Sequence, residues 1–279
     1  MSCLFVEHLC VIDCAALHAE RGLIGESWIV DVELEGGLDE QGMVLDFGRV
    51  KPLVKSLIDE HVDHRLLVPM RAPGLRLDRG ASELRLTWRY GDRELFHRSP
   101  LSAVCLLDCE ALTPPAVEEH VRGLCAGAMP GNVTAVRVSL REENIAGASY
   151  RYVHGLRQHG GNCQRIAHGH RSRVEVYRDG RRCEAGERWL AERWRDIYLG
   201  CRADLAASEE AGPCRFSYAA PQGEFELVID RDRCELLDTE STVEQIARHA
   251  ALLLKRRDPG STYRVRAYEG VMKGAIADV

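Results

Sequence analysis

The chain is predicted to be an α+β protein that contains two similar halves. Strand-like alternation and helical periodicity both occur, and their order along residues 1–145 returns along residues 146–279. Alternation with a period of two predicts strands, whereas apolar residues at i, i+3, i+4 and i+7 predict helices. The same order of predicted elements occurs twice in a chain of 279 residues, which indicates a duplicated compact domain, because a solenoid needs more repeats.

The first half reads as a hairpin, a helix, a second helix and a strand. Residues 4–15 form a β-rich run and apolar residues alternate over 28–35, which predicts a β-hairpin with a turn region over 22–25. The first helix is predicted to begin near Gly48 and to have one buried stripe, formed by Val50, Leu53, Val54, Leu57 and Ile58. Pro114 opens the second helix, and residues 134–140 alternate as a strand.

The second half has nearly the same order of elements. Its predicted elements are a hairpin (150–155 and 171–177), a helix (187–198), a strand (224–229), a helix that Thr242 caps and that runs to Lys255, and a strand (262–268).

Composition and charge exclude several classes of protein. A net charge of −6 and a pI near 6.0 argue against general nucleic-acid binding. No secretory segment and no apolar run of membrane-spanning length are present, so a cytoplasmic protein without a membrane partner is expected. The 11 cysteines are scattered and contain no Cys-x-x-Cys pair, which favours buried thiols over a disulfide framework.

Three histidines form a candidate metal site. His168 and His170 are separated by one glycine, so on a strand their imidazoles lie on the same face. His154 ends the neighbouring predicted strand and supplies a third nitrogen. Three neutral imidazoles with an open fourth position are typical of a catalytic zinc. The alternative is a His-x-His pair that occurs by chance on an exposed strand.

Cys163 lies between these histidines in a glycine-rich loop. A thiol near Zn²⁺ loses its proton easily and becomes a nucleophile or a base, or it is the fourth ligand of a structural zinc. Residues 144–174 contain no acid, but they contain five arginines, Arg151, Arg157, Arg165, Arg171 and Arg173. This local excess indicates an anionic ligand such as phosphate, unless it is only a solvated basic face.

These residues resemble the 6-pyruvoyl- and 6-carboxy-tetrahydropterin synthases of the tunnelling-fold group. In the second half, His154, Cys163 and the pair His168 and His170 resemble the family's zinc strands and its catalytic cysteine. Tyr268-Glu269 resembles the strand whose glutamate anchors the pterin, and Thr242 resembles the start of the helix beside the pterin pocket. In the first half, Asp46-Phe47 and the helix that ends in Asp63-His64 resemble the family's acid/base pair.

The departures from the family pattern are complementary. The first half has Ile24-Gly25-Glu26-Ser27-Trp28 where the family has two metal histidines. The second half has Ile197-Tyr198-Leu199-Gly200 where the family has Asp-His. Neither half contains a whole site, but together they contain one set of metal histidines and one Asp-His pair.

The resemblance implies two tandem tunnelling-fold domains of ββααββ type, over 1–145 and 146–279. It also implies antiparallel sheets with helices on one face, which close into a barrel in a homo-oligomer. Zn²⁺ is the implied cofactor. Cys163, Asp63 and His64 are the implied catalytic residues, and Glu269 and Thr242 with Arg165 and Arg171 are expected to bind the substrate and its triphosphate.

The implied substrate is 7,8-dihydroneopterin triphosphate, and the implied product is a 6-carboxy-tetrahydropterin of queuosine and 7-deazaguanine synthesis. Three alternatives stay open. They are 6-pyruvoyl-tetrahydropterin synthase activity, a non-catalytic pterin- or purine-binding zinc paralogue, and an unrelated three-histidine zinc hydrolase. A hydrolase would need a nearby glutamate as general base, which the acid-free stretch disfavours.

Overall fold

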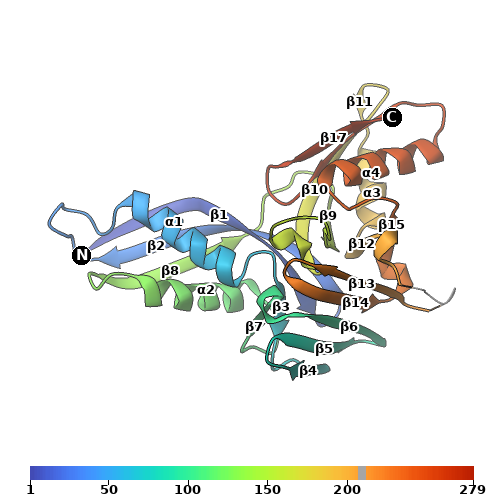
Figure 1. Ribbon diagram of the computed structural model, residues 1–279. Coiled ribbons are helices and arrows are strands. Elements are labelled where there is room, and N and C mark those ends of the chain that lie inside the picture. The colour runs from blue at the N-terminus through green and yellow to red at the C-terminus, as the bar shows by residue number, and fades with distance from the viewer. Residues whose placement is uncertain (207–211) are drawn as a thin grey trace.

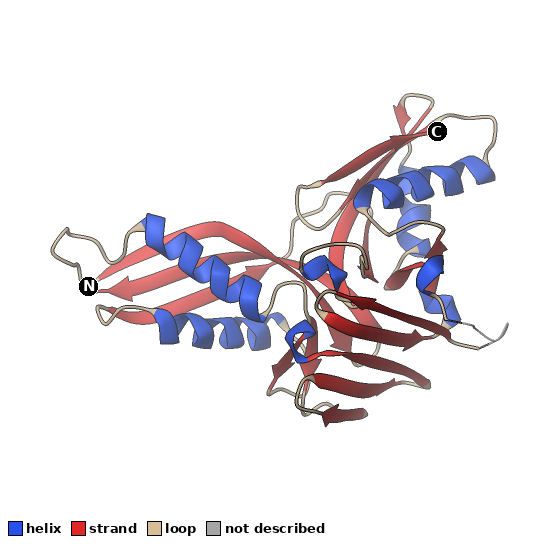
Figure 2. Ribbon diagram, viewed as in Figure 1, coloured by secondary structure: helices blue, strands red, loops and turns tan. Residues whose placement is uncertain are grey.

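The computed structural model describes residues 1–206 and 212–279, which form three β-sheets and their covering helices (Figure 1). The first sheet has the strand order β7-β3-β1-β2-β8. Its strands are β1 (Ser2–His18), β2 (Gly22–Gly36), β3 (Leu66–Pro69), β7 (Val104–Leu107) and β8 (Val133–Arg141). Helices α1 (Phe47–His61) and α2 (Pro114–Ala128) lie on one face of this sheet (Figure 2).

The second sheet has the order β15-β12-β9-β10-β16-β17, with β11 paired to β10. Its strands are β9 (Ser149–His154), β10 (His168–Arg178), β11 (Arg181–Arg182), β12 (Ile197–Cys201), β15 (Cys234–Leu237), β16 (Tyr263–Tyr268) and β17 (Gly274–Asp278). Its helices are α3 (Glu184–Arg193) and α4 (Val243–Arg257). Short 3-10 helices lie at Leu101–Ala103, Asn162–Gln164, Arg202–Asp204 and Arg231–Arg233.

The two sheets repeat one topology. In the first, β1 pairs antiparallel with β2 and parallel with β3, and β2 pairs antiparallel with β8. In the second, β9, β10, β12 and β16 take the corresponding places with the same directions. The prediction of two tandem α+β units is therefore confirmed. The boundary predicted near residue 145 falls between β8 and β9.

A third sheet joins the two units, and the sequence did not predict it. It has the order β13-β14-β6-β5-β4, with strands β4 (Leu75–Arg79), β5 (Glu83–Tyr90), β6 (Arg93–Pro100), β13 (Cys214–Ala220) and β14 (Gly223–Ile229). Strands from the first unit pair with strands from the second where β6 meets β14. Its apolar face buries Trp88 and Phe216 in one core cluster with residues of both units. Burial of such large rings stabilises the joined arrangement.

Two local predictions differ from the structure. The helix predicted over 187–198 covers 184–193 instead, and Ile197 and Tyr198 begin β12. Asp196 has a φ of 55°, a left-handed conformation that ends the helical path and lets the chain return as a buried strand. The turn expected over 22–25 lies at residues 19–21, because Gly22 already belongs to β2.

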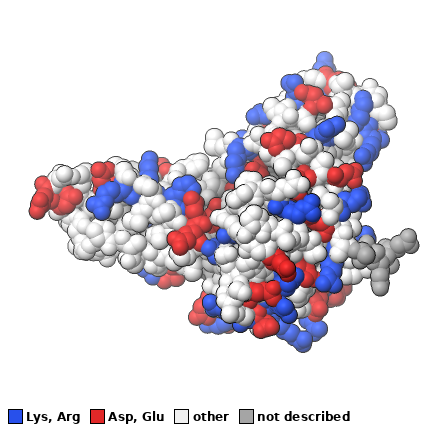
Figure 3. Space-filling view, viewed as in Figure 1, with Lys and Arg blue, Asp and Glu red and all other residues white. Residues whose placement is uncertain are grey.

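Charges of both signs are interspersed over the face shown in Figure 3, without a large field of one sign. This face therefore offers no broad basic surface for nucleic acid. Among the described residues, the helices are too short or too polar to span a membrane.

Candidate metal centre and active site

Three buried imidazoles meet where β9 and β10 run side by side. The strand register pairs His168 with His154, and the alternation of β10 places His170 on the same face as His168. One ring nitrogen of each lies within 4.8 Å of the others, and all three residues are at most 1% exposed. The predicted cluster of three histidines is therefore present as a geometric group.

The Nδ1 atoms of the three rings are all turned toward the protein. Nδ1 of His154 lies 3.0 Å from the carbonyl oxygen of Ser241, and Nδ1 of His168 lies 3.0 Å from that of Arg165. Because a carbonyl only accepts, each of these nitrogens donates its proton, and Nε2 keeps its lone pair.

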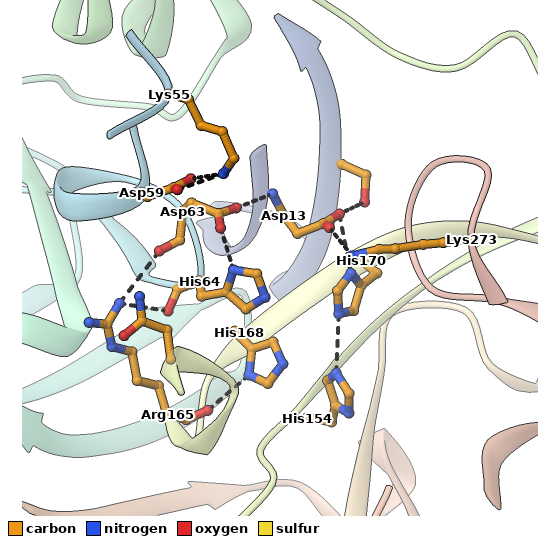
Figure 4. A network of polar contacts seen from close by, with 12 residues as sticks. Asp13, Lys55, Asp59, Asp63, His64, His154, Arg165, His168, His170 and Lys273 are labelled. Carbon is orange, nitrogen blue, oxygen red and sulfur yellow. Dashed lines mark hydrogen bonds and ion pairs between the residues drawn. The ribbon is translucent and has the colours of Figure 1, made fainter. Parts of the chain in front are cut away.

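The third ring, His170, has a carboxylate rather than a carbonyl beside its Nδ1, at ion-pair distance. Its Nδ1 lies 3.2 Å from Oδ1 of Asp13, a carboxylate carried by β1 of the first unit. Its Nε2 faces Nε2 of His154 at 3.2 Å. Figure 4 shows the three rings, with Asp13 beside His170 and Arg165 beside His168.

The residues present fit a zinc ion. Burial lowers the pKa of His154 and of His168 well below the usual value, and the neighbouring histidines add to this effect, so both rings are neutral. Nε2 of His168 is buried and has no hydrogen-bond partner among the described residues. Zn–N bonds of about 2.0–2.1 Å in a tetrahedron separate two ligands by about 3.3 Å, close to the observed 3.2 Å.

An acid/base pair from the first unit lies beside this cluster. Asp63 and His64 follow α1, and His64 has a φ of 55°, which turns its ring toward the second unit. Nδ1 of His64 lies 2.5 Å from Oδ2 of Asp63, and its ring centroid lies 5.2 Å from that of His168. Burial opposes the charged form, but the hydrogen bonds with Asp63 and Cys163 raise the pKa of His64 to about 10.

Cys163 lies in the 3-10 helix at residues 162–164, within the loop that joins β9 to β10. Its sulfur groups with ring nitrogens of His64 and His168, all within 4.8 Å of one another. This is a different group from the three imidazoles, with His168 shared between the two. The thiol is thus positioned beside the acid/base pair rather than as a fourth member of the imidazole cluster.

The two predicted arginines make contacts within the protein. Arg165 is 5% exposed and donates to the carbonyl oxygens of Asp63 and His64 at 3.4 and 3.2 Å. These bonds tie the Cys163 loop to the acid/base pair. Arg171 pairs with Glu142 at 3.1 Å and donates to the carbonyl of Glu143 at 2.9 Å. Their predicted contact with phosphate stays a prediction.

The two remaining predicted substrate residues have uncommitted side chains. Glu269 follows β16, is partly buried, and its carboxylate forms no hydrogen bond or ion pair with the described residues. Thr242 is the N-cap of α4, but its hydroxyl does not cap that helix. Thr113, the corresponding residue of α2, accepts a hydrogen bond from the Ala116 amide. Both Glu269 and Thr242 therefore have polar groups to offer to a ligand.

The strand register identifies the corresponding positions of the first unit. In the first unit, Ala15 pairs with both Gly25 of β2 and Leu66 of β3. In the second unit, Val153 pairs in the same way with Gly169 of β10 and Tyr198 of β12. By this register, the positions of His154, His168 and His170 correspond to those of Ala16, Ile24 and Glu26 in the first unit. The same count matches His64 with Asp196, whose φ is also 55°.

Ion pairs stand at these corresponding positions. Glu26 lies 3.0 Å from Nε of Arg151, and Arg21 donates to Asp196 at 2.9 Å from its Nε. Glu142, which corresponds to Glu269, pairs with Arg151 at 2.6 Å. We call this cluster, formed by Arg21, Glu26, Glu142, Arg151 and Asp196, the silent site. Its carboxylates are paired with guanidinium groups, and among the described residues the first unit has no comparable set of three metal ligands.

Sequence reasoning missed Asp13 and Ser241. Asp13 is the one charged residue in the apolar run from 9 to 17, and a carboxylate in a buried strand was the available signal. Ser241 directly precedes Thr242, and both its carbonyl oxygen and its hydroxyl contact Nδ1 of His154, at 3.0 and 3.1 Å. The two residues lie far apart in the sequence, so no local pattern could have identified that contact.

The first unit matches a known protein family. The model of the 6-pyruvoyl tetrahydropterin synthase family matches residues 12–152, which include Asp13, Asp63 and His64. A catalytic-residue mutant of 6-pyruvoyltetrahydropterin synthase from Plasmodium vivax shares 18% identity at a TM-score of 0.42, covering 50% of this chain and 90% of that chain. The Plasmodium falciparum enzyme shares 16% identity at 0.41 over the same shares. A search of curated protein sequences found no match. The family model covers half of the sequence, and the chain belongs to the 6-pyruvoyl tetrahydropterin synthase family.

Proposed function

We propose that this protein is a zinc-dependent lyase of the 6-carboxy-tetrahydropterin synthase type, acting on 7,8-dihydroneopterin triphosphate. The family to which the chain belongs is one of pterin synthases. The observation that carries the proposal is the meeting of Cys163 and His64 beside three buried imidazoles. A proton-transfer pair next to a ligand set for zinc is what such a reaction on a hydroxylated side chain needs.

The chain's own residues would share the work as follows. Glu269 would accept hydrogen bonds from the pterin amino group and ring N–H, and its carboxylate forms no hydrogen bond or ion pair with the described residues. The Cys163 thiolate would move a proton on the substrate side chain, and His64 would relay it. Asp63 would hold the imidazole of His64 in one orientation, as its 2.5 Å contact supports.

His154, His168 and His170 would hold the zinc ion through Nε2. Zinc, when bound, supplies a Lewis acid that lowers the pKa of substrate hydroxyls. The division of labour within one chain is supported by the position of Asp63 and His64, which belong to the first unit but lie beside the second unit's imidazoles. In this proposal the two units form one complete site.

We also propose a cytoplasmic homo-oligomer whose sheets close by pairing between chains. Strand β17 ends the second sheet and leaves Ile276 58% exposed, and β8 ends the first. Exposed sheet edges favour pairing with another chain. Size-exclusion chromatography with light scattering would test this assembly, and a monomer at micromolar concentration would contradict it.

The proposed function is tested with purified, zinc-loaded protein and 7,8-dihydroneopterin triphosphate. Product mass separates a 6-carboxy product from a 6-pyruvoyl product, and no consumption of substrate would favour a non-catalytic binder. Cys163→Ala should lower turnover by about 10²- to 10⁴-fold and keep the zinc. Cys3→Ala, an exposed thiol in β1, is the matched control with unchanged activity. Loss of zinc in Cys163→Ala would indicate a structural metal instead.

A further inference from the structure

We propose that Asp13 is the positioning residue that joins the two parts of this site, through its carboxylate to the metal ligand His170 and through its backbone to Asp63 and His64. This inference rests on the proposed function. Asp13 belongs to β1 of the first unit and touches no substrate atom in the proposal.

The contacts of Asp13 reach both parts. Its Oδ1 lies 3.2 Å from Nδ1 of His170. Its backbone N–H donates to Oδ1 of Asp63 at 2.8 Å, and its carbonyl accepts from the N–H of His64 at 2.7 Å. One residue therefore sets the direction of a ligand ring from the second unit and the place of the acid/base pair from the first (Figure 4).

The carboxylate itself is held from several sides. Asp13 is 3% exposed, its Oδ1 accepts from the hydroxyl of Ser27 at 2.5 Å, and its Oδ2 lies 3.3 Å from Nζ of Lys273. Gly270, which has a φ of +66°, passes so close that a Cβ there would lie 2.4 Å from Oδ1. A carboxylate with so little room keeps one orientation toward His170.

The silent site provides an internal comparison. Position 13 corresponds to position 151, and position 170 corresponds to position 26, so Asp13–His170 and Arg151–Glu26 are the same contact in the two units. The fold thus brings these two positions together in both places. Only the Asp–His pair has the chemistry that orients an imidazole, because a carboxylate beside Nδ1 attracts that side of the ring and leaves Nε2 to face a metal.

The experiment compares Asp13→Asn with Arg151→Met, its counterpart in the silent site. Zinc affinity is measured by competition of Zn²⁺ with a chromogenic chelator, and kcat and KM are measured with 7,8-dihydroneopterin triphosphate. The loss of such an orienting partner typically weakens metal binding about 10- to 100-fold. We expect that weakening in Asp13→Asn, together with a fall in kcat at nearly unchanged KM, and unchanged zinc affinity in Arg151→Met.

Unchanged zinc affinity in Asp13→Asn overturns the inference, and so does an equal loss in Arg151→Met, which would indicate a general effect on folding. If Asp13→Asn does not fold, Ser27→Ala tests the inference instead. It removes the hydrogen bond from the Ser27 hydroxyl to Oδ1 of Asp13, and zinc affinity should fall as well. An unchanged affinity there also overturns the inference.

The outcomes separate this inference from the proposed function. A wild-type protein that binds zinc but forms no product, with weaker binding in Asp13→Asn, refutes the function and keeps the role of Asp13. A fully active wild-type protein whose zinc affinity does not change in Asp13→Asn refutes the role of Asp13 and keeps the proposed function. A wild-type protein that binds no zinc refutes both.

Discussion

Gly25 and Gly169 lie back to back where β2 of the first unit crosses β10 of the second. A Cβ atom on Gly169 would lie 2.7 Å from Cα of Gly25, and one on Gly25 would lie 2.1 Å from the carbonyl oxygen of Tyr152. Because corresponding residues of the two units meet at this crossing, the two sites lie on either side of it. The close approach lets each unit contribute side chains to the other unit's site.

Gly169→Ala is therefore expected to destabilise the protein by about 1–3 kcal/mol, the usual cost of forcing extra atoms into a packed position. Zinc affinity should fall as well, since His168 and His170 flank the glycine. Urea unfolding measures the first effect and chelator competition the second. Gly123→Ala in α2 is the control, because a Cβ there meets nothing within 4 Å and helical alanine is favoured by about 0.5–1 kcal/mol. Equal stability of Gly169→Ala and wild type would contradict the crossing.

The chain is expected to bind one zinc ion, although it contains two similar units. Ala16, Ile24 and Glu26 occupy the first unit's ligand positions, and Glu26 is already paired with Arg151. Metal analysis of the purified protein should give one equivalent per chain, and His168→Ala should abolish it. Two equivalents, or one equivalent that survives in His168→Ala, would show that the ligands are elsewhere.

His64→Asn is expected to lower turnover by about 10²- to 10⁴-fold, as the loss of a general acid/base does. Zinc content should not change, because His64 lies outside the group of three imidazoles. His61→Ala is a matched control, since His61 lies three residues earlier at the end of α1 and its side chain is 41% exposed. A variant of His64 that loses zinc and activity together would make His64 a ligand instead of a relay.

Asp204 is expected to make stability depend on pH. Burial raises its pKa from 3.8 to about 6, with Glu240 adding to the rise and Arg157, at 2.8 Å, opposing it. The folded protein then binds a proton that the unfolded chain has already released. Its free energy of unfolding should fall as the pH increases from about 4 to about 6, by the linkage between proton binding and folding.

Urea titrations at several pH values, on wild type and on Asp204→Asn, measure this dependence. The variant should show a flatter profile over that interval, because its amide does not titrate. Since Arg157 belongs to the loop that contains Cys163, the ion pair also anchors that loop. The same slope in both proteins would assign the pH dependence to another group.

Much of the fold was accessible from local patterns. The apolar stripe of α1, the alternation in β2 and β8 and the proline at the start of α2 are set by residues close in sequence. The three histidines were also recognisable, since His168 and His170 share a strand face and His154 lies opposite His168. These features depend on the backbone geometry of one hairpin.

Other features depend on contacts between distant segments. The third sheet arises because β6 pairs with β14, more than 100 residues later, and no local pattern encodes that pairing. The end of α3 depended on the left-handed conformation of Asp196, whose carboxylate is held by Arg21 of the other unit.

By itself, the sequence determined that two α+β units follow one another, that one carries three histidines and a cysteine, and that the other carries Asp63 and His64. Only the tertiary structure decided that these parts meet within one chain and that Asp13 lies between them. The physical reason is that β2 and β10 cross in backbone contact at Gly25 and Gly169. Such a contact depends on how the two strands pack, which the sequence of either strand alone does not determine.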